Sequence, residues 1–130
     1  MVELIEFTIS TSKQRDIIDI TDKIEKRIDF NKGVCIVHVP HATAGLIINE
    51  YEPNIKQDYL TFFENLTKGE NYKHNKIDNN AEAHLLSALV GPSKHFIVKD
   101  KRLVLGTWQR VLLCEFDGPR TRKIVIHLQK

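Results

Sequence analysis

The alternation of apolar and polar residues predicts most of the strands in this chain. LIEFTIS at 4–10 has the two-residue period of a strand, and GVCIVHVP at 33–40 is a β-branched run that Pro40 ends. AGLIIN at 44–49 is a second apolar run of strand length. Toward the end of the sequence, four more apolar runs predict strands without intervening helices: HFIV, RLVLG, WQRVLLCEF and KIVIHLQ.

Apolar residues spaced three or four positions apart predict two helices in the first half. Ile20, Ile24 and Ile28 share one face of a helix predicted between Asp19 and Asn31, and Ile17, just before this helix, falls on the same face. Thr21 or Asp19 can cap the start of this helix, and Gly33 follows its end. Pro53 opens a second helix, where its missing N–H costs nothing. The stripe that this helix is expected to bury consists of Ile55, Tyr59, Phe62, Phe63 and Leu66.

A third helix is predicted at 81–90, AEAHLLSALV, with Asn80 as its cap and Gly91-Pro92 at its end. The polar segment at 67–80, TKGENYKHNKIDNN, is longer than an ordinary connection, which is typical of a functional loop. The late strands without alternating helices argue against a doubly wound parallel fold. We therefore expect an α+β domain whose mostly antiparallel sheet is covered by helices on one face.

Length and composition narrow the class of protein. With 130 residues, of which 42% are hydrophobic, the chain suits one domain spanning 1–130. Its net charge is +2 and its basic residues are scattered, so neither nucleic acid nor an anionic membrane is expected as a partner. No stretch approaches the roughly 20 apolar residues of a membrane span, and MVELIEFTIS does not read as a signal peptide. Cys35 and Cys114 lie in apolar runs without a C-x-x-C pair, which indicates buried thiols in a reduced cytoplasm.

Three of the six histidines are candidates for chemistry. His41 lies beyond Pro40 at a strand end, His74 lies in the long polar loop, and His84 lies in the first turn of the third helix. Imidazole is the commonest metal ligand and also acts as a general acid or base near neutral pH. No zinc spacing such as H-E-x-x-H is present, so each can equally be a solvated or hydrogen-bonded structural residue. We interpret the remaining three as structural: His38, His95 and His127.

Other polar residues at the ends of predicted elements allow two interpretations each. Glu50 can bind a metal or move a proton, or it can, like Glu52, favour the positive end of the helix that opens at Pro53. Arg120 in DGPR can offer its guanidinium to phosphate or be a solvated turn residue. Trp108 in GTWQ can line a site or be a buried core residue. The residues alone thus indicate an α+β domain with a candidate pocket of His, Glu and Arg.

Three blocks, taken in order, resemble the YjbQ-like family, also called the secondary thiamine-phosphate synthase family. They are HATAGLIINE at 41–50, NNAEAHLLSALVGPS at 79–93 and RLVLGTWQRVLLCEFDGPRTRKIVI at 102–126. The family pattern reads H-T-[TS]-A-G, N-x-[DE]-A-H-L and L-G-T-W-Q-G followed by D-G-P-R. This chain departs from it at Ala42, where threonine is usual, and at Arg110, where glycine is common. The first departure removes a hydroxyl near the histidine, and the second alters the exposed face of that strand.

The resemblance, which runs from about residue 3 to residue 128, carries expectations about fold and function. It implies a two-layer α+β fold with a mixed sheet and a homotrimer with pockets near its subunit boundaries that hold metal or anions. The activity attached to the family joins a hydroxymethylpyrimidine diphosphate to a thiazole phosphate and releases pyrophosphate, as a secondary activity. The implied partner is a small phosphorylated molecule, and the implied cofactor is a divalent metal, zinc or magnesium.

The family's motif positions also imply roles for individual residues. Three imidazoles would hold the metal, carboxylates would ligate it or accept a proton, arginines would meet phosphate, and an indole and an amide would meet the pyrimidine ring. The sets that these positions imply are metal ligands His41, His74 and His84; the catalytic residue Glu50; and substrate-binding residues Arg102, Trp108, Gln109 and Arg120. The sequence itself adds Asn49, beside Glu50, as a catalytic candidate and Thr43, near His41, as a substrate-binding candidate. It also adds Asp78, near His84, as a catalytic candidate whose carboxylate can ligate the metal or accept a hydrogen bond from an imidazole.

Two hypotheses share this predicted pocket. The first is a transferase of the thiamine-phosphate synthase type. The second is a protein that binds a metal or a phosphorylated metabolite and has only incidental catalysis. A scaffold or interaction module is less favoured, because the polar residues cluster at the ends of elements. A specificity constant far below about 10⁴ M⁻¹s⁻¹, the low end for ordinary enzymes, would favour the second hypothesis.

Overall fold

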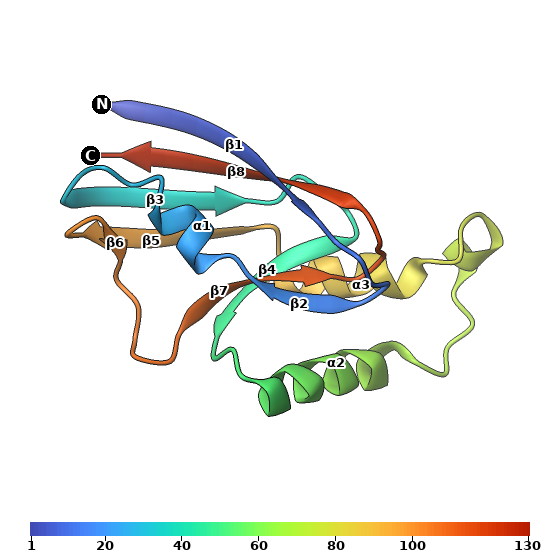
Figure 1. The fold of residues 1–130 in the computed structure, drawn as a ribbon. Helices are drawn as coiled ribbons and strands as arrows, with labels where there is room; N and C mark the ends of the chain where they lie inside the picture. Colours follow the sequence, from blue (N-terminus) through green and yellow to red (C-terminus); the bar gives the residue numbers. More distant parts are fainter.

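Eight strands form two sheets in the computed structural model, which describes residues 1–130 (Figure 1). The large sheet has the order β1 (Val2–Ser10), β8 (Thr121–Gln129), β3 (Lys32–His38), β5 (Ser93–Lys99) and β6 (Arg102–Leu103). The small sheet has the order β2 (Asp16–Asp19), β7 (Arg110–Glu115) and β4 (Ala44–Asn49). Every pairing between neighbouring strands is antiparallel. The α+β class is confirmed.

The helices are α1 (Thr21–Glu25), α2 (Pro53–Thr67) and α3 (Ala81–Val90), with a short 3₁₀ helix η1 (Lys73–Lys76) before α3. Helices α2 and α3 cover one face of the small sheet, whose other face packs against the large sheet (Figure 1). Residues of α1 join the core between the sheets, whereas α2 and α3 form the outer layer. The layers therefore follow in the order large sheet, small sheet, helices.

Strand β7 contributes to both cores because its side chains alternate between its two faces. Val111 and Leu113 point into the core between the sheets, while Leu112 and Cys114 point into the core beneath α2 and α3. All four side chains are fully buried. Burial of one such aliphatic side chain contributes about 1.5–3 kcal/mol to stability. The uninterrupted apolar run VLLC is thus explained by a central strand with helices on one side and a sheet on the other.

Gly45 allows α3 to approach β4 more closely than any other residue would. A Cβ at this position would lie 2.4 Å from Cγ2 of Val90 and 2.9 Å from the carbonyl oxygen of Gly91. The same contact is fixed by hydrogen bonds, since the Ser87 hydroxyl donates to the Ala44 carbonyl at 2.6 Å. The Leu46 N–H donates to the Gly91 carbonyl at 3.0 Å. These contacts set the position of α3 relative to the start of β4.

Two predicted elements have the bounds that the sequence indicates. β4 spans 44–49 and α3 spans 81–90, and Gly91 and Pro92 end α3 as expected. Cys35 and Cys114 are free and buried, as predicted, and burial raises the pKa of both thiols to about 12. Thiols with so high a pKa are protonated and unreactive near neutral pH. None of the helices is long and apolar enough to cross a membrane.

The helix predicted from Asp19 to Asn31 is wrong in length, because α1 ends at Glu25. Ile17 lies in β2, opposite Cys114 of β7, so the shared isoleucine face begins as a strand. β-Branched residues favour strands, and pairing with the central β7 overrides the helical spacing. The start of α1 follows the prediction in part, since Asp19 Oδ1 accepts a hydrogen bond from the Thr21 N–H at 3.0 Å.

The predicted buried stripe of α2 is also only partly present. Phe63 is buried, but Phe62 is 60% exposed and Leu66 is 50% exposed. Of the two glutamates that could favour the start of α2, it is Glu52 that does so. Its side chain accepts hydrogen bonds from the first N–H groups of α2. Glu52 is therefore the N-cap of α2. RLVLG, predicted as a full strand, forms only the two-residue β6.

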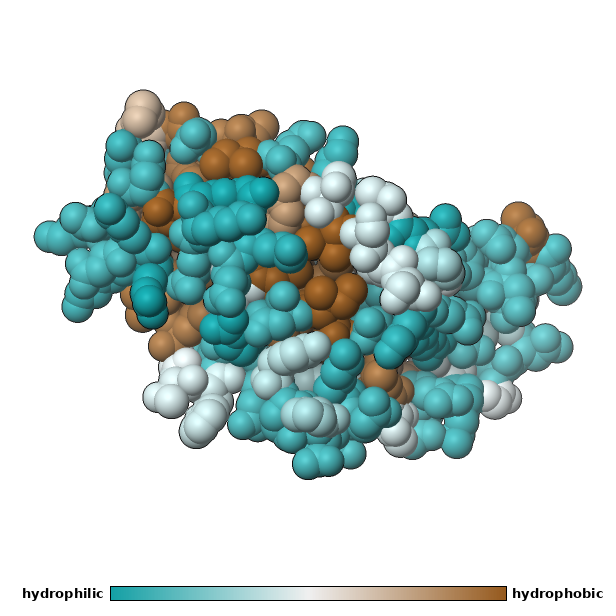
Figure 2. All heavy atoms as spheres, viewed as in Figure 1, coloured by the Kyte–Doolittle hydropathy of each residue, from teal (hydrophilic) through white to brown (hydrophobic).

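The outer face of the large sheet and the exposed edge of the helices leave apolar side chains in contact with solvent. Figure 2 shows hydrophobic residues reaching the surface near the end of the molecule where β1 begins. On this sheet the exposed apolar residues are Val2, Leu4, Val34, Ile36 and Ile97, and on the helices they include Phe62, Leu66, Leu85 and Leu89. Contiguous exposed apolar residues of this kind mark interaction surfaces.

Substitution Gly45→Ala tests the close contact between β4 and α3. Because the new methyl group would meet both Val90 and the backbone of Gly91, we expect a loss of about 1–3 kcal/mol in the free energy of unfolding, measured by urea titration. Gly106→Ala is the matched control, because the nearest atom to its added Cβ lies 3.4 Å away. Equal stability of the two variants would contradict the assignment of Gly45 to this contact.

Candidate functional site

Three segments that are distant in sequence meet around one broad, open pocket. They are the stretch before β4, the start of α3 with the loop before it, and the turn between β7 and β8. The pocket has a volume of about 720 Å³, and its residues are Pro40, His41, Ala42, Thr43, Asp78, Asn80, His84, Asp117, Pro119, Arg120, Thr121 and Arg122. Loop and element ends of this kind commonly carry binding and catalytic groups.

Arg122, which lines this pocket, forms a buried ion pair with Glu115. The Arg122 Nε–H donates to Glu115 Oε1 at 2.9 Å, and its Nη2 donates to Glu115 Oε2, so the pair is bidentate. Nη2 also donates to Thr43, at 2.9 Å to the hydroxyl and 3.1 Å to the carbonyl. The Thr11 hydroxyl and the Asp117 N–H complete the contacts of the carboxylate, at 2.7 Å and 3.1 Å. Removing either partner would leave an uncompensated buried charge, which costs about 3–5 kcal/mol.

His41 is held at the pocket wall by a backbone hydrogen bond. Its Nε2 accepts the N–H of Lys123 at 2.7 Å. Because an accepting nitrogen carries no proton, the neutral ring has its proton on Nδ1. Burial lowers the pKa of His41 below its ordinary value, and the nearby Arg122 guanidinium lowers this pKa further, while Glu115 opposes the shift. His41 is thus a neutral imidazole with Nδ1–H as donor near pH 7.

A second chain of polar contacts joins the long loop to the turn between β7 and β8. His74 Nε2 lies 2.9 Å from Asn80 Oδ1, and Asn80 Nδ2 donates to Asp117 Oδ2 at 2.9 Å. Arg120 Nη2 donates to the same Asp117 oxygen at 3.0 Å. Burial alone would raise the pKa of the Asp117 carboxyl, but the hydrogen bonds from Asn80 and Arg120 overcome this and lower it. Asp117 therefore stays ionised and orients both neighbours.

His84 joins this chain through His74, whose ring centroid lies 4.7 Å away in an edge-to-face arrangement. The helix that carries His84 starts differently from the prediction, since the Asn80 side chain makes no capping hydrogen bond. Instead, Asn75 Oδ1 accepts the Ala81 N–H at 3.0 Å. The sequence predicted Asn80 as the cap of this helix, but the Asn80 side chain is hydrogen-bonded to His74 and Asp117 instead.

Six of the predicted site residues are therefore brought together. Five of them line the pocket: His41, Thr43, Asp78, His84 and Arg120. The sixth, His74, does not line it but contacts two lining residues, His84 and Asn80. Asn49 and Glu50 lie elsewhere, at the opposite end of β4, where Asn49 pairs with Arg110. A six-residue strand spans about 20 Å, so its two ends do not share one pocket. Within this chain, the structure does not place Asn49 and Glu50 with the histidines.

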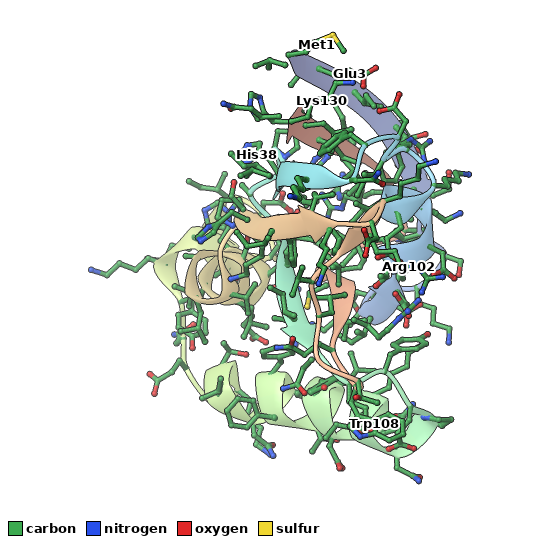
Figure 3. All side chains as sticks on the ribbon, turned by 90° about the vertical axis from the view of Figure 1, so that its left-hand side faces the viewer. Met1, Glu3, His38, Arg102, Trp108 and Lys130 are labelled. Atoms are coloured by element: carbon green, nitrogen blue, oxygen red, sulfur yellow. The ribbon has the colours of Figure 1, made fainter.

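The remaining predicted substrate-binding residues are also outside the pocket. Trp108 is 71% exposed, which excludes the interpretation as a buried core residue, and Gln109 accepts the Gly106 N–H at 2.8 Å. Figure 3 shows Trp108 at the opposite end of the molecule from Met1, and Arg102 on a separate edge. Arg110, the departure from the family pattern, forms ion pairs with Asp19 and Asp22 at 2.7 Å and 3.0 Å.

The geometry tests whether the three predicted histidines suit one divalent cation. No group of three or more His, Cys, Asp or Glu side chains has an arrangement that could hold a metal ion. The His41 ring has no free lone pair while Nε2 accepts the Lys123 N–H. His74 donates from Nε2 to Asn80, which leaves a lone pair on Nδ1, and the His84 ring packs edge-to-face against the His74 ring. The arrangement does not fit three imidazole ligands, and of the three histidines only His74 and His84 have their rings in contact.

Sequence reasoning missed the residues that organise the pocket, above all Glu115 and Arg122. A glutamate inside the apolar run WQRVLLCEF and an arginine seven positions later, beyond a turn, were the available signal. Buried charges are rare unless they are paired, so an isolated charge in a central strand predicts a partner nearby. Asp117 and Asn80 carried no such signal, since turns and helix starts ordinarily contain them.

The fold and the pocket define an antiparallel α+β domain with a polar site at one end of its small sheet. Residues 5–130 match the family model described as UPF0047 protein YjbQ-like. A UPF0047 protein from Archaeoglobus fulgidus is 46% identical over 122 residues, covering 93% of this chain and 97% of that protein. The UPF0047 protein YugU from Bacillus subtilis is 40% identical, covering 92% and 94%.

Solved structures agree with these matches. A protein from Aeropyrum pernix is 40% identical, with a TM-score of 0.93 and 98% of both chains covered. A YbjQ-like protein of unknown function from Sulfolobus solfataricus is 38% identical, with a TM-score of 0.90, covering 98% of this chain and 96% of that one. The chain belongs to the UPF0047, YjbQ-like family.

The environment of His41 predicts a titration below the ordinary histidine range. Because burial and Arg122 disfavour the charged ring, we expect the midpoint, followed by two-dimensional NMR of the imidazole, to lie below about 6.5. The unfolded chain then binds a proton before the folded chain does. Stability from this group is fully present above about pH 6.5 and is lost as the pH falls toward the folded midpoint. A midpoint at or above 6.5 would contradict the assigned tautomer and environment.

Proposed function

We propose that this protein is a transferase of the secondary thiamine-phosphate synthase type. The substrates are a hydroxymethylpyrimidine diphosphate and a thiazole phosphate, and the by-product is pyrophosphate. The thiazole nitrogen supplies the electron pair for a new bond to the pyrimidine methylene carbon. The bond from that carbon to the diphosphate oxygen breaks, and its electron pair leaves with the diphosphate. The observation that carries the proposal is a single pocket lined both by donors for anions and by a carboxylate without an ion-pair partner in this chain.

The charges that develop in this reaction match the residues that line the pocket. Negative charge develops on the leaving oxygen, and hydrogen-bond donors directed at it lower the barrier. Arg120 and His41 are such donors. Positive charge develops at the methylene carbon and on the thiazole nitrogen, and the Asp78 carboxylate, which has no ion-pair partner in this chain, suits it. The thiazole nitrogen loses no proton in the transfer, so no general base is needed in the pocket.

A divalent cation is a separate part of the proposal. His74 and His84, whose rings are in contact, would supply imidazole ligands, and oxygens of the diphosphate and water would supply the others. When bound, zinc or magnesium would neutralise charge on a diphosphate. The fit is stronger for zinc than for magnesium, because magnesium prefers oxygen ligands.

The alternative function is binding of a phosphorylated metabolite with only incidental catalysis. The open form of the pocket favours this alternative, because a site that does not exclude water gains less from electrostatic stabilisation. The two functions share the same residues. They differ in rate, since an ordinary enzyme reaches a specificity constant of about 10⁴ M⁻¹s⁻¹ or more.

The transferase proposal predicts a loss of thiamine-phosphate formation when the pocket is altered. We expect His84→Ala and Arg120→Ala each to lower kcat/KM at least about tenfold, since each removes a polar group from the pocket. Arg102→Ala, an exposed arginine on a separate edge outside the pocket, is the matched control. The assay is run with chelator and with added zinc or magnesium, which tests the cation separately. Equal rates in the three variants would contradict the assignment of the pocket.

We also propose that the protein is a homotrimer in the cytoplasm. Its support is the family resemblance together with the apolar residues exposed on the large sheet and on α2 and α3. Two different apolar surfaces on one chain suit a cyclic assembly, in which one surface of each copy meets the other surface of the next. Light scattering at micromolar concentration should give the mass of three chains of 15.0 kDa, and a monomer mass would contradict this proposal.

A further inference from the structure

The guanidinium of Arg122 is only partly used by the chain. Arginine has five N–H donors. Nε and Nη2 are bound to Glu115 and Thr43, whereas Nη1 donates to no acceptor. The side chain is 3% exposed, yet no fully buried side-chain nitrogen or oxygen lacks a partner. Nη1 must therefore reach the surface, and since Arg122 lines the pocket, this donor faces into it.

Two further donors face the same pocket without an acceptor in the chain. The Thr43 hydroxyl accepts from Arg122 Nη2 at 2.9 Å but donates its own proton to no group. The Nδ1–H of His41 is likewise unused, because only Nε2 is engaged, by the Lys123 N–H. Both residues line the pocket, and Thr43 is almost fully buried. An arginine, a hydroxyl and an imidazole thus present free N–H or O–H groups to one space.

The carboxylate that balances Arg122 is held away from that space. Glu115 accepts four hydrogen bonds, from Thr11, Asp117 and two nitrogens of Arg122, and it does not line the pocket. The second acidic group nearby, Asp117, is paired with Arg120 at 3.0 Å. An anion in the pocket would therefore meet the free edge of the guanidinium, while the negative charge of Glu115 lies behind it.

We propose that Arg122, Thr43 and His41 form a subsite for a tetrahedral oxyanion, the phosphate group of a phosphorylated small molecule. Three donors on three different residues suit the several oxygens of a phosphate better than the two coplanar oxygens of a carboxylate. Asp78, also a lining residue of the pocket, would repel an anion, so the neutral or cationic part of the ligand lies on its side. This subsite deepens the proposed function, on which it rests for the identity of the whole substrate.

Inorganic phosphate is the probe for this subsite, with acetate as the planar comparison. In wild-type protein labelled with ¹⁵N at arginine, phosphate should shift the guanidinium signals of Arg122 and leave those of Arg27 unchanged. Thr43→Val, which keeps the shape of the side chain and removes the hydroxyl, should weaken phosphate affinity about tenfold in calorimetry. Thr8→Val, on the exposed face of β1, is the matched control and should bind phosphate like wild type.

The outcomes separate the subsite from the transferase activity. Unshifted Arg122 signals, or tighter binding of acetate than of phosphate, would overturn the subsite. If Thr43→Val fails to fold, the wild-type NMR measurement still decides. Phosphate binding at Arg122 without any formation of thiamine phosphate would keep the subsite and remove the transferase. Formation of thiamine phosphate without a shift of the Arg122 signals would keep the transferase and overturn the subsite.

Discussion

An ion pair that is buried away from water must be satisfied by hydrogen bonds within the protein. Glu115 and Arg122 form such a pair between the two sheets. Glu115 ends β7 of the small sheet, whereas Arg122 lies in β8 of the large sheet. Thr11 follows β1 and Thr43 precedes β4, so the pair collects the ends of four strands. Because a broken pair would leave a charge in a dry environment, these ends are held at fixed distances. The walls of the pocket are built on this junction.

The ion pair between Glu115 and Arg122 also explains why the pocket presents hydrogen-bond donors. This neutral pair adds no net charge, but its geometry presents the guanidinium on one side and hides the carboxylate on the other. Around it, Asp117 is neutralised by Arg120, and His41 is kept uncharged by burial and by Arg122. The result is a site whose hydrogen-bond donors are fixed in direction before any ligand arrives. Fixed donors avoid the reorganisation that flexible surface lysines would require.

The sequence predicted elements well where local pattern and tertiary packing agree. β4 and α3 have clear periods and strong end signals, including Gly91-Pro92. The helix from Asp19 to Asn31 was predicted too long because a line of isoleucines fits a helical face and a strand almost equally well. Pairing with β7 makes the segment around Ile17 a strand, and the local sequence cannot reveal a pairing with a strand so distant in the chain. For the site, residues at the ends of elements were chosen as candidates without asking which end of each element they occupy. His41 and Glu50 flank the same predicted strand, whose length of about 20 Å already separates them.

The pairing of β1 with β8 has a practical consequence for engineering. Val2 lies opposite Gln129, and the Lys130 N–H donates to the Met1 carbonyl at 3.3 Å, so the first and last residues are neighbours (Figure 1). They lie at the end of β8 away from Thr121 and the pocket, about 26 Å along the strand. A short Gly-Ser linker would therefore join them into a circular permutant, reopened at the exposed Gly69. New ends at that loop would separate the segment bearing His74 and His84 from α2 while leaving both sheets uncut.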